Sequence, residues 1–384
     1  MTELFLPFSK PSISREAIDD VVTCLESGWI TTGPRVAQFT EDLKAYLSAP
    51  LVLPIASATA GLHLVLLSLD LQPGDEVITT PLTFVATLNA IVLAGGTPVL
   101  VDIDPHTFNM DVDRVSDAIT DKTRAILPVH FAGLPVDLDP IYAIAEQYQL
   151  RVIEDAAHAM GADYKGRRIG SAGDTHVFSF HPNKNMTTGE GGCVATRDEA
   201  LARQVSALRF HGIDREAWNR YGKNGNQEYD VVMPGFKYNM MDLQAALGIH
   251  QLKALDGFID RRRELALRYQ EALADWPQWT LPGTPLFDHR HAWHLYTPLM
   301  NEAVSGMNRN MFMERMKEKN IGTGLHFRPA HLYSYYQEEF GFRSGDFPIA
   351  EDIGERIVSL PLFPRMTDAD HDRVLDVMYT LFNS

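Results

Sequence analysis

The stretch VFSFHPNKNMTTGEGG, residues Val177–Gly192, decides the fold class through its content and its place in the chain. An apolar strand runs into a loop that holds one lysine, Lys184, among polar and small residues. A lysine in a closed pocket loses hydration, so its pKa falls and its amine becomes a nucleophile. Ser179 and nearby backbone amides can hold a phosphate. Taken alone, however, a loop lysine is more simply a solvated surface charge.

Two earlier segments give this lysine a context. VIEDAAH, at Val152–His158, ends an apolar strand in two carboxylates. A carboxylate there can bind a metal, act as a base, pair with a cationic ring nitrogen, or simply cap the next helix. ASATAG, at Ala56–Gly61, opens a helix whose free N–H groups and positive dipole end suit a phosphate. The plainer interpretation of this second segment is an ordinary N-cap.

Around these segments, short apolar runs of β character alternate with helical stretches. The alternation predicts an α/β fold with a largely parallel sheet covered by helices, and such sheets place their chemistry at the carboxyl ends of strands. The expected strands are Glu76–Thr79, Pro98–Val101, Ala125–Val129, Arg151–Ile153 and His176–Phe180, and the expected helices between them include Thr59–Leu69 and Pro140–Tyr148.

The two ends of the chain differ from this middle part. At the N-terminus, Ser14 can cap a helix that Gly28 ends, with an apolar stripe of Ile18, Val21, Val22 and Leu25. Toward the C-terminus, helices are expected at Met241–Leu255 and Phe258–Ala274, followed by closely spaced prolines and fewer, shorter elements. We therefore predict a large domain over residues 1–255 and a smaller C-terminal α/β domain over 256–384, completed by part of the N-terminal segment.

Composition limits the function classes. The 384 residues are 45% hydrophobic, enough for a substantial core, and the net charge of −16 argues against binding nucleic acid or an anionic membrane. Only two cysteines are present, Cys24 and Cys193, and no apolar run is long enough to span a bilayer. We expect a cytoplasmic protein. Since HExxH, Walker A and GxGxxG patterns are missing from the sequence, we expect no metal and no NAD enzyme.

The order of the three segments, phosphate cradle, acid and lysine loop, is that of the aspartate-aminotransferase-like fold, type I of the pyridoxal-phosphate (PLP) transferases. Over nearly its whole length the sequence resembles the DegT/StrS-type nucleotide-sugar aminotransferases. The motifs that carry the resemblance are GWITTGP (28–34), SATAGLH (57–63), PLTFVATLNAI (81–91), EDAAHAMGA (154–162), SFHPNKNMTTGEGG (179–192), FKYNMMDLQAALG (236–248) and SLPLFP (359–364).

The resemblance implies roles for individual residues. Lys184 matches the lysine that carries PLP as a Schiff base, and Asp155 matches the partner of the pyridinium nitrogen. The other implied cofactor contacts are His158 near the ring hydroxyl, Phe84 stacked on the ring, Ala58, Thr59 and Ser179 at the phosphate, and Asn239 at the phosphate from the second subunit of a homodimer. Candidate substrate contacts are His294, His326 and Arg328; Arg209, His211, Arg215, Arg220 and Lys223 are weaker candidates for a diphosphate.

Within the family, LESGWITTGP and IGTGLHFRPAH (321–331) resemble the enzyme that makes UDP-4-amino-4-deoxy-L-arabinose for lipid A and lipopolysaccharide. The implied reaction moves an amino group from L-glutamate, which becomes 2-oxoglutarate, to a 4-keto nucleotide sugar. At position 183 the family usually has an apolar residue or Thr, and Asn183 departs from this pattern. The identity of the sugar is therefore left undecided, and another keto sugar, such as a 4-keto-6-deoxyhexose, remains an alternative. A PLP-dependent sugar dehydratase would replace the lysine with His, and a non-catalytic relative would lose Lys184 or Asp155.

Overall fold

A computed structural model describes residues 4–213 and 229–383 of the chain. Its strands are β1 (Leu51–Ile55), β2 (Glu76–Thr79), β3 (Thr97–Leu100), β4 (Thr123–Ile126), β5 (Arg151–Asp155), β6 (Asp163–Tyr164), β7 (Arg167–Arg168), β8 (Thr175–Ser179), β9 (Gly192–Thr196), β10 (Trp279–Thr280), β11 (His289–Arg290) and β12 (Leu299–Met300). Its α-helices are α1 (Arg15–Glu26), α2 (Pro34–Leu47), α3 (Ala58–Leu67), α4 (Val85–Leu93), α5 (Leu138–Tyr148), α6 (Glu199–Leu208), α7 (Asp242–Leu273), α8 (Glu302–Ser305), α9 (Arg309–Glu318), α10 (Ser334–Phe340), α11 (Pro348–Arg356) and α12 (Asp368–Asn383).

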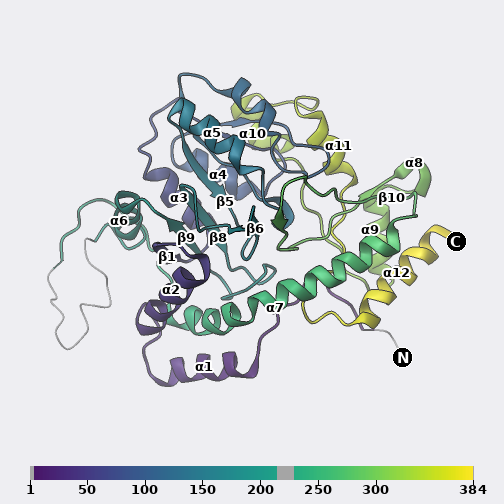
Figure 1. Cartoon of the computed structure of the whole chain (residues 1–384), viewed down its shortest axis with the longest axis horizontal. Helices are drawn as coiled ribbons and strands as arrows, with labels where there is room; N and C mark the ends of the chain where they lie inside the picture. The colour runs from purple at the N-terminus through teal and green to yellow at the C-terminus, as the bar shows by residue number, and fades with distance from the viewer. Residues whose placement is uncertain (1–3, 214–228, 384) are drawn as a thin grey trace.

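The centre of the molecule is a seven-stranded sheet in the order β1-β9-β8-β5-β4-β2-β3 (Figure 1). Neighbouring strands from β8 to β3 run parallel, while β9 runs antiparallel to both β8 and β1. The five expected strands are present, each within three residues of its predicted ends. The largely parallel α/β sheet predicted from the alternation is therefore confirmed, and β1 and β9 are additions to it.

Helices cover both faces of this sheet. One apolar cluster joins the sheet to α3, α4 and α6, through residues such as Leu64, Ile91 and Val205. A second cluster on the opposite face joins it to α2, α5 and α7, through residues such as Phe39 and Ile141. Because parallel strands are buried on both faces, this arrangement explains why their sequences are apolar runs without strict alternation.

Helix α7 departs from the sequence prediction. Two helices were expected, separated near Asp256 and Gly257, but α7 is continuous over 32 residues. Gly257 costs only about 1 kcal/mol in a helix interior, and a Cβ there would meet no atom within 4 Å. Leu255 and Ile259 on either side are buried, so packing along one face carries the helix through this position.

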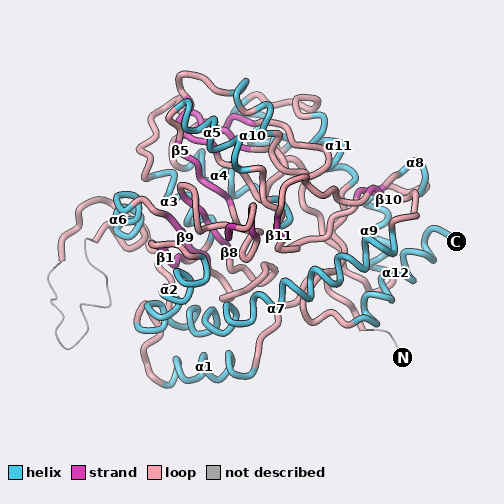
Figure 2. The backbone as a smooth tube through the Cα atoms, viewed as in Figure 1, coloured by secondary structure: helices cyan, strands magenta, loops and turns pink. Residues whose placement is uncertain are grey.

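The C-terminal part has its own apolar cluster, in which Leu6 packs with residues of α7, α9 and α12. Leu6 also forms a bridge with Ile321, so the N-terminal segment lies against the C-terminal part, as expected. This part is rich in loops (Figure 2). The division into two domains at residue 255 stays a prediction, since α7 crosses it without a break.

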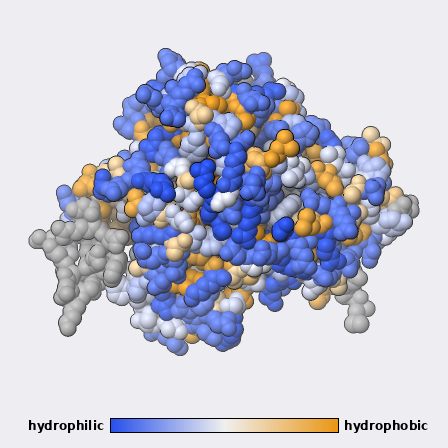
Figure 3. Space-filling model, in the orientation of Figure 1, coloured by the Kyte–Doolittle hydropathy of each residue, from blue (hydrophilic) through white to orange (hydrophobic). Residues whose placement is uncertain are grey.

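Helix α1 leaves most of its apolar stripe uncovered. Ser14 caps it as predicted, accepting a hydrogen bond from Ala17 N at 3.2 Å. The side chains that α1 buries are Ala17 and Cys24, whereas Ile18, Val22 and Leu25 are 43–52% exposed. The face of the molecule drawn in Figure 3 is mostly hydrophilic with small scattered apolar patches. Within the described residues, no helix has the length and apolar character needed to cross a membrane.

Candidate active site

One cavity of about 750 Å³ gathers most of the residues singled out from the sequence. It lies at the carboxyl ends of β5 and β8, where the alternation predicts the chemistry. Seven of the eight implied cofactor contacts line it: Ala58, Thr59, Phe84, Asp155, His158, Ser179 and Lys184. Of the three candidate substrate contacts, His326 and Arg328 line it as well.

One corner of the cavity is built for an anion. Ser57 caps α3 and accepts a hydrogen bond from Ala60 N at 3.1 Å, which places Ala58 and Thr59 in the first turn. The N–H groups of a first turn have no partner within their own helix. Gly192 packs so closely here that an added Cβ would lie 2.8 Å from Ala58 N. Ser179, at the end of β8, completes this corner from the sheet side.

The Asp155 carboxylate is held at the end of β5. It is 5% exposed and accepts hydrogen bonds from Thr87 Oγ1 at 2.8 Å and from Ala157 N at 3.1 Å. Burial raises the pKa of Asp155, although these two hydrogen bonds and nearby Lys184 oppose the shift. The helix-cap interpretation is wrong, because the chain turns into the short strand β6 rather than into a helix.

Lys184 faces the same cavity from the loop after β8. Burial lowers its pKa to about 8, and the charge of Asp155 acts in the opposite direction. An amine with this pKa is largely protonated near neutral pH but releases its proton far more readily than a surface lysine. The solvated-lysine interpretation is therefore wrong, and Lys184 is placed to act as a nucleophile or a base.

Aromatic rings form the walls of the cavity. Phe84, at the start of α4, is 57% exposed, and its ring centroid lies 6.0 Å from that of Phe327. His158 is 6% exposed and lies parallel to Phe327 at 6.0 Å. Burial, followed by the charges of Lys184 and His326, holds the pKa of His158 well below its usual range. Phe84 and His158 thus both lie next to Phe327 in the wall of the cavity, where aromatic rings can contact a planar ligand.

The three candidate substrate residues lie at different depths. Arg328 is exposed at the mouth, where its Nη2 donates to Leu332 O at 2.8 Å and its guanidinium lies 5.2 Å from the Tyr333 ring. His326 hydrogen-bonds Ser359 Oγ at 2.8 Å, and burial lowers its pKa to about 3. His294 lies behind His158, with their ring centroids 4.3 Å apart, and is not among the residues that line the cavity in the described structure.

Asn239 is the implied cofactor contact that lies elsewhere. It forms an antiparallel β-bridge with Ile55, and its Nδ2 donates a hydrogen bond to Thr32 Oγ1 at 2.5 Å. Asn239 and Arg209 line a separate cavity of about 340 Å³. Arg209 Nη1 donates to Pro54 O at 2.8 Å. Among the other weak diphosphate candidates, Arg215, Arg220 and Lys223 lie outside the described residues.

Thr87 and Glu154 take part in the site although neither is predicted from the sequence to have a role. Thr87 lies in the PLTFVATLNAI motif four residues after Thr83, and the two hydroxyls lie 2.8 Å apart. Residues four apart on a helix lie on the same face, so this spacing is the sequence feature that could have indicated the pair. Glu154 is fully buried and faces away from the cavity, where Tyr142 Oη donates to it at 2.6 Å and His130 Nε2 lies 2.8 Å away. Glu154 therefore fixes strand β5 from behind while Asp155 faces the site.

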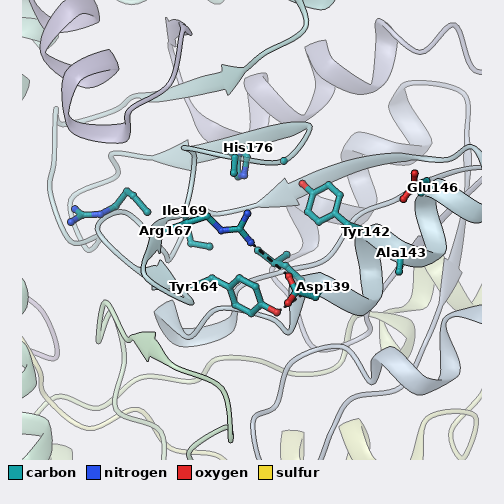
Figure 4. Close-up of a pocket in the computed structure, with 12 residues that line it drawn as sticks. Asp139, Tyr142, Ala143, Glu146, Tyr164, Arg167, Ile169 and His176 are labelled. Atoms are coloured by element: carbon teal, nitrogen blue, oxygen red, sulfur yellow. Dashed lines mark hydrogen bonds and ion pairs between the residues drawn. The ribbon is translucent and has the colours of Figure 1, made fainter.

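A second cavity, of about 420 Å³, opens on this opposite side (Figure 4). Tyr142, Tyr164 and His176 line it, and Arg167 approaches Asp139 across it at 3.7 Å. It contains none of the implied cofactor contacts. Within the described parts of the chain, no group of three or more His, Cys, Asp or Glu side chains is arranged to hold a metal ion. The chemistry of the chain therefore centres on the first cavity.

Comparisons with known proteins show the family of the chain. The model of the DegT/DnrJ/EryC1/StrS aminotransferase family matches residues 11–379. The spore coat polysaccharide biosynthesis protein SpsC of Bacillus subtilis is 47% identical over 379 residues, which cover 97% of this chain and 96% of SpsC.

Solved structures extend the agreement to the fold. The sugar aminotransferase Spr1654 of Streptococcus pneumoniae, in its PMP form, superposes with a TM-score of 0.91 and 32% identity, covering 98% of this chain and 99% of the other. Helicobacter pylori PseC, an aminotransferase of pseudoaminic acid biosynthesis, superposes with a TM-score of 0.90 and 29% identity, covering 99% of both chains. The chain has the type I fold of PLP-dependent transferases, and it belongs to the DegT/DnrJ/EryC1/StrS aminotransferase family.

Proposed function

We propose that this PLP-dependent aminotransferase transfers the amino group of L-glutamate to a keto sugar carried by a nucleotide. One observation carries the proposal: Lys184 and Asp155 line the same cavity, the lysine with a lowered pKa and the carboxylate buried and held in place. These are the two groups that transamination requires of the protein, a nucleophilic amine and an anion to pair with a cationic ring.

The residues of the cavity fit PLP. The anion-binding corner at Ala58 and Ser179 suits its phosphate, and the exposed ring of Phe84 in the cavity wall suits contact with its ring. Asp155 would hold the ring nitrogen, and Lys184 would hold the aldehyde carbon. When bound, PLP supplies a sink for the electrons that remain when a C–H bond at the amino-bearing carbon breaks.

The proton transfers fall to Lys184. With PLP and glutamate bound, Lys184 Nζ would be the base that accepts the proton of the glutamate Cα and the acid that later returns it. A pKa of about 8 lets the same nitrogen accept and return a proton near neutral pH. Asp155 keeps its negative charge throughout because a cation then lies against it, which offsets the effect of burial on its pKa.

Two sugar classes are candidates for the acceptor. The segments that resemble the arabinose enzyme favour UDP-4-keto-pentose, which would place the enzyme in lipopolysaccharide or lipid A modification. The alternative is another keto sugar such as a 4-keto-6-deoxyhexose for a different glycan; PseC and SpsC are named for the biosynthesis of pseudoaminic acid and of a spore coat polysaccharide. In either case Arg328, which is exposed and lines the cavity, would be the residue that meets the diphosphate.

The test is the visible absorbance of the purified enzyme with PLP. We expect L-glutamate to bleach the band and the correct keto sugar nucleotide to restore it; UDP-4-keto-pentose is compared with UDP- and dTDP-4-keto-6-deoxyhexoses. Lys184→Ala should not bleach, whereas the control Lys165→Ala, at an exposed lysine paired with Asp139, should behave as the natural enzyme does. If glutamate bleaches the band and none of these sugars restores it, the substrate proposal is wrong.

We also propose a homodimer with shared active sites. The uncovered stripe on α1 supplies apolar surface for a second copy, and Asn239 lies away from its own chain's cavity. Lys184→Ala and Asn239→Ala variants, each inactive alone, should regain up to about a quarter of natural activity when unfolded and refolded together, since one site in four then has both residues. A mixture that stays inactive would place Asn239 outside the site.

A further inference from the structure

Arg262 is an unusual residue of α7. It is 2% exposed, yet no carboxylate lies within ion-pair distance of its guanidinium in the described residues. Its Nη1 instead donates to three carbonyl oxygens: Leu362 at 2.8 Å, His294 at 3.1 Å and Trp293 at 3.4 Å. All three bonds use this one nitrogen, and Nε has no hydrogen-bond partner in the described structure, so the buried guanidinium depends on these carbonyl groups. The bonds hold the loop that carries Trp293 and His294 against α7.

The same loop is also fixed from the opposite side. Ala292 N donates to Gly133 O at 2.9 Å, and Leu295 N donates to Ala132 O at 3.3 Å. Gly133 has φ of +92°, and a Cβ there would lie 3.2 Å from His294 N. The backbone of His294 is therefore confined between α7 and the segment that follows β4.

This confinement directs the His294 ring against His158. The two centroids lie 4.3 Å apart with the rings tilted by 47°. Neither nitrogen of His294 has a hydrogen-bond partner, nor does Nδ1 of His158, although all three are buried. Buried polar atoms without partners are costly and rare, so a ring with two of them next to an active site calls for a function.

The protonation state of the pair defines what that function can be. Burial holds the pKa values of both His158 and His294 well below their usual range. A neutral imidazole has one N–H donor and one acceptor nitrogen, so two neutral rings in contact can hydrogen-bond in series. When one nitrogen of His158 accepts a hydrogen bond, the proton of the neutral ring is fixed on the other nitrogen; when it donates one, the proton is fixed on that nitrogen.

We propose that His294 is a positioning residue that sets the ring orientation and tautomer of His158, through the ring contact seen here and through a hydrogen bond formed when the two rings turn toward each other. His158 then presents a defined donor or acceptor to the cofactor ring, and Arg262 holds His294 in place for this task. The inference rests on the PLP site of the proposed function but is independent of the sugar, since His294 acts behind His158.

The experiment compares His294→Phe, which keeps the ring but removes both nitrogens, with His294→Asn, which keeps one donor and one acceptor. The control is His371→Phe, at another buried histidine, whose ring packs on Tyr269 at 4.0 Å within the C-terminal cluster. Three quantities are measured: the dissociation constant of PLP, the pH midpoint of the absorbance of bound PLP, and the urea midpoint of the cofactor-free protein.

We expect His294→Phe to weaken PLP binding about tenfold and to shift the pH midpoint by at least half a unit, with His294→Asn recovering most of both. His371→Phe should change the urea midpoint alone. A His294→Phe protein with natural PLP affinity and pH midpoint would show that the ring only packs, and would overturn the proposal. If His294→Phe does not fold, His294→Leu takes its place as the variant without nitrogens: altered PLP affinity and pH midpoint in His294→Leu that His294→Asn largely recovers support the proposal, and any other result overturns it. Because no readout uses a sugar, failure of the substrate proposal leaves this test intact.

Discussion

Replacing Thr87 with valine tests whether the Thr87 hydroxyl stabilises the ionised form of Asp155. Valine keeps the shape of threonine but removes the hydroxyl that donates to Asp155 Oδ2 at 2.8 Å. A hydrogen bond to an ionised carboxylate contributes about 1.5–3 kcal/mol, and one to a neutral partner about 0.5–1.5 kcal/mol. The ionised form of Asp155 therefore loses about 1–1.5 kcal/mol more than the protonated form does.

That difference sets the size of the expected effect. One pKa unit corresponds to about 1.36 kcal/mol, so the pKa of Asp155, already raised by burial, should rise by about one further unit. PLP binding requires the ionised carboxylate, and so affinity falls once the pH drops below this pKa. In Thr87→Val the fall should begin about one pH unit higher than in the natural enzyme.

The assay is the dissociation constant of PLP for the cofactor-free protein, measured across pH. Thr80→Val is the matched control, because Thr80 is 1% exposed and its hydroxyl has no hydrogen-bond partner. The control should leave the pH profile unchanged. An identical profile in Thr87→Val would refute the view that this hydroxyl stabilises the Asp155 charge.

Further predictions concern stability, each measured by urea unfolding. Gly133→Ala should cost more than the about 1–2 kcal/mol of a left-handed residue, because its Cβ would lie 2.8 Å from a carbonyl oxygen; Gly166→Ala, also at positive φ but with open space, should cost only that amount. Tyr142→Phe should lower the unfolding free energy by about 1.5–3 kcal/mol, since it removes a donor to buried Glu154, and an unchanged value would contradict the assigned hydrogen bond. The depressed pKa of His326 stabilises the fold above pH 6.5, and this contribution is lost as the pH falls from 6.5 toward 3. His326→Asn should therefore reduce the fall in unfolding free energy over this range by up to about 1.4 kcal/mol per pH unit. An equally steep fall in the variant would count against this role of His326.

The parts of the fold that could be predicted are those with a strong local signal. The parallel strands are continuous apolar runs, and two of the three motifs lie at the ends of β5 and β8, so the sequence predicts one site for Lys184, Asp155 and Ser179. The antiparallel strand β9 was not predicted, because Gly192–Thr196 directly follows a glycine-rich loop and its partner β1 is distant in the chain.

What the sequence could not supply are the contacts between distant segments. The hydrogen bond from Thr87 to Asp155 spans 68 residues, and the contact of Arg262 with Leu362 spans 100. Neither residue type at its own position signals such a partner. The continuity of α7 through Gly257 likewise depends on the burial of its neighbours, which local propensity does not contain.

The pairing of β1 with β9 has a consequence for how the protein is made. In the seven-stranded sheet, the partner of Leu51–Ile55 is the segment Gly192–Thr196. A ribosome that adds about 5–20 residues per second needs roughly 7–30 s to travel from one segment to the other. During that interval the apolar β1 strand has no place in the sheet, and its edge is open to unwanted association. The newborn chain is therefore most vulnerable to aggregation before residue 196 emerges, and slow closure of this non-local pair should limit its rate of folding.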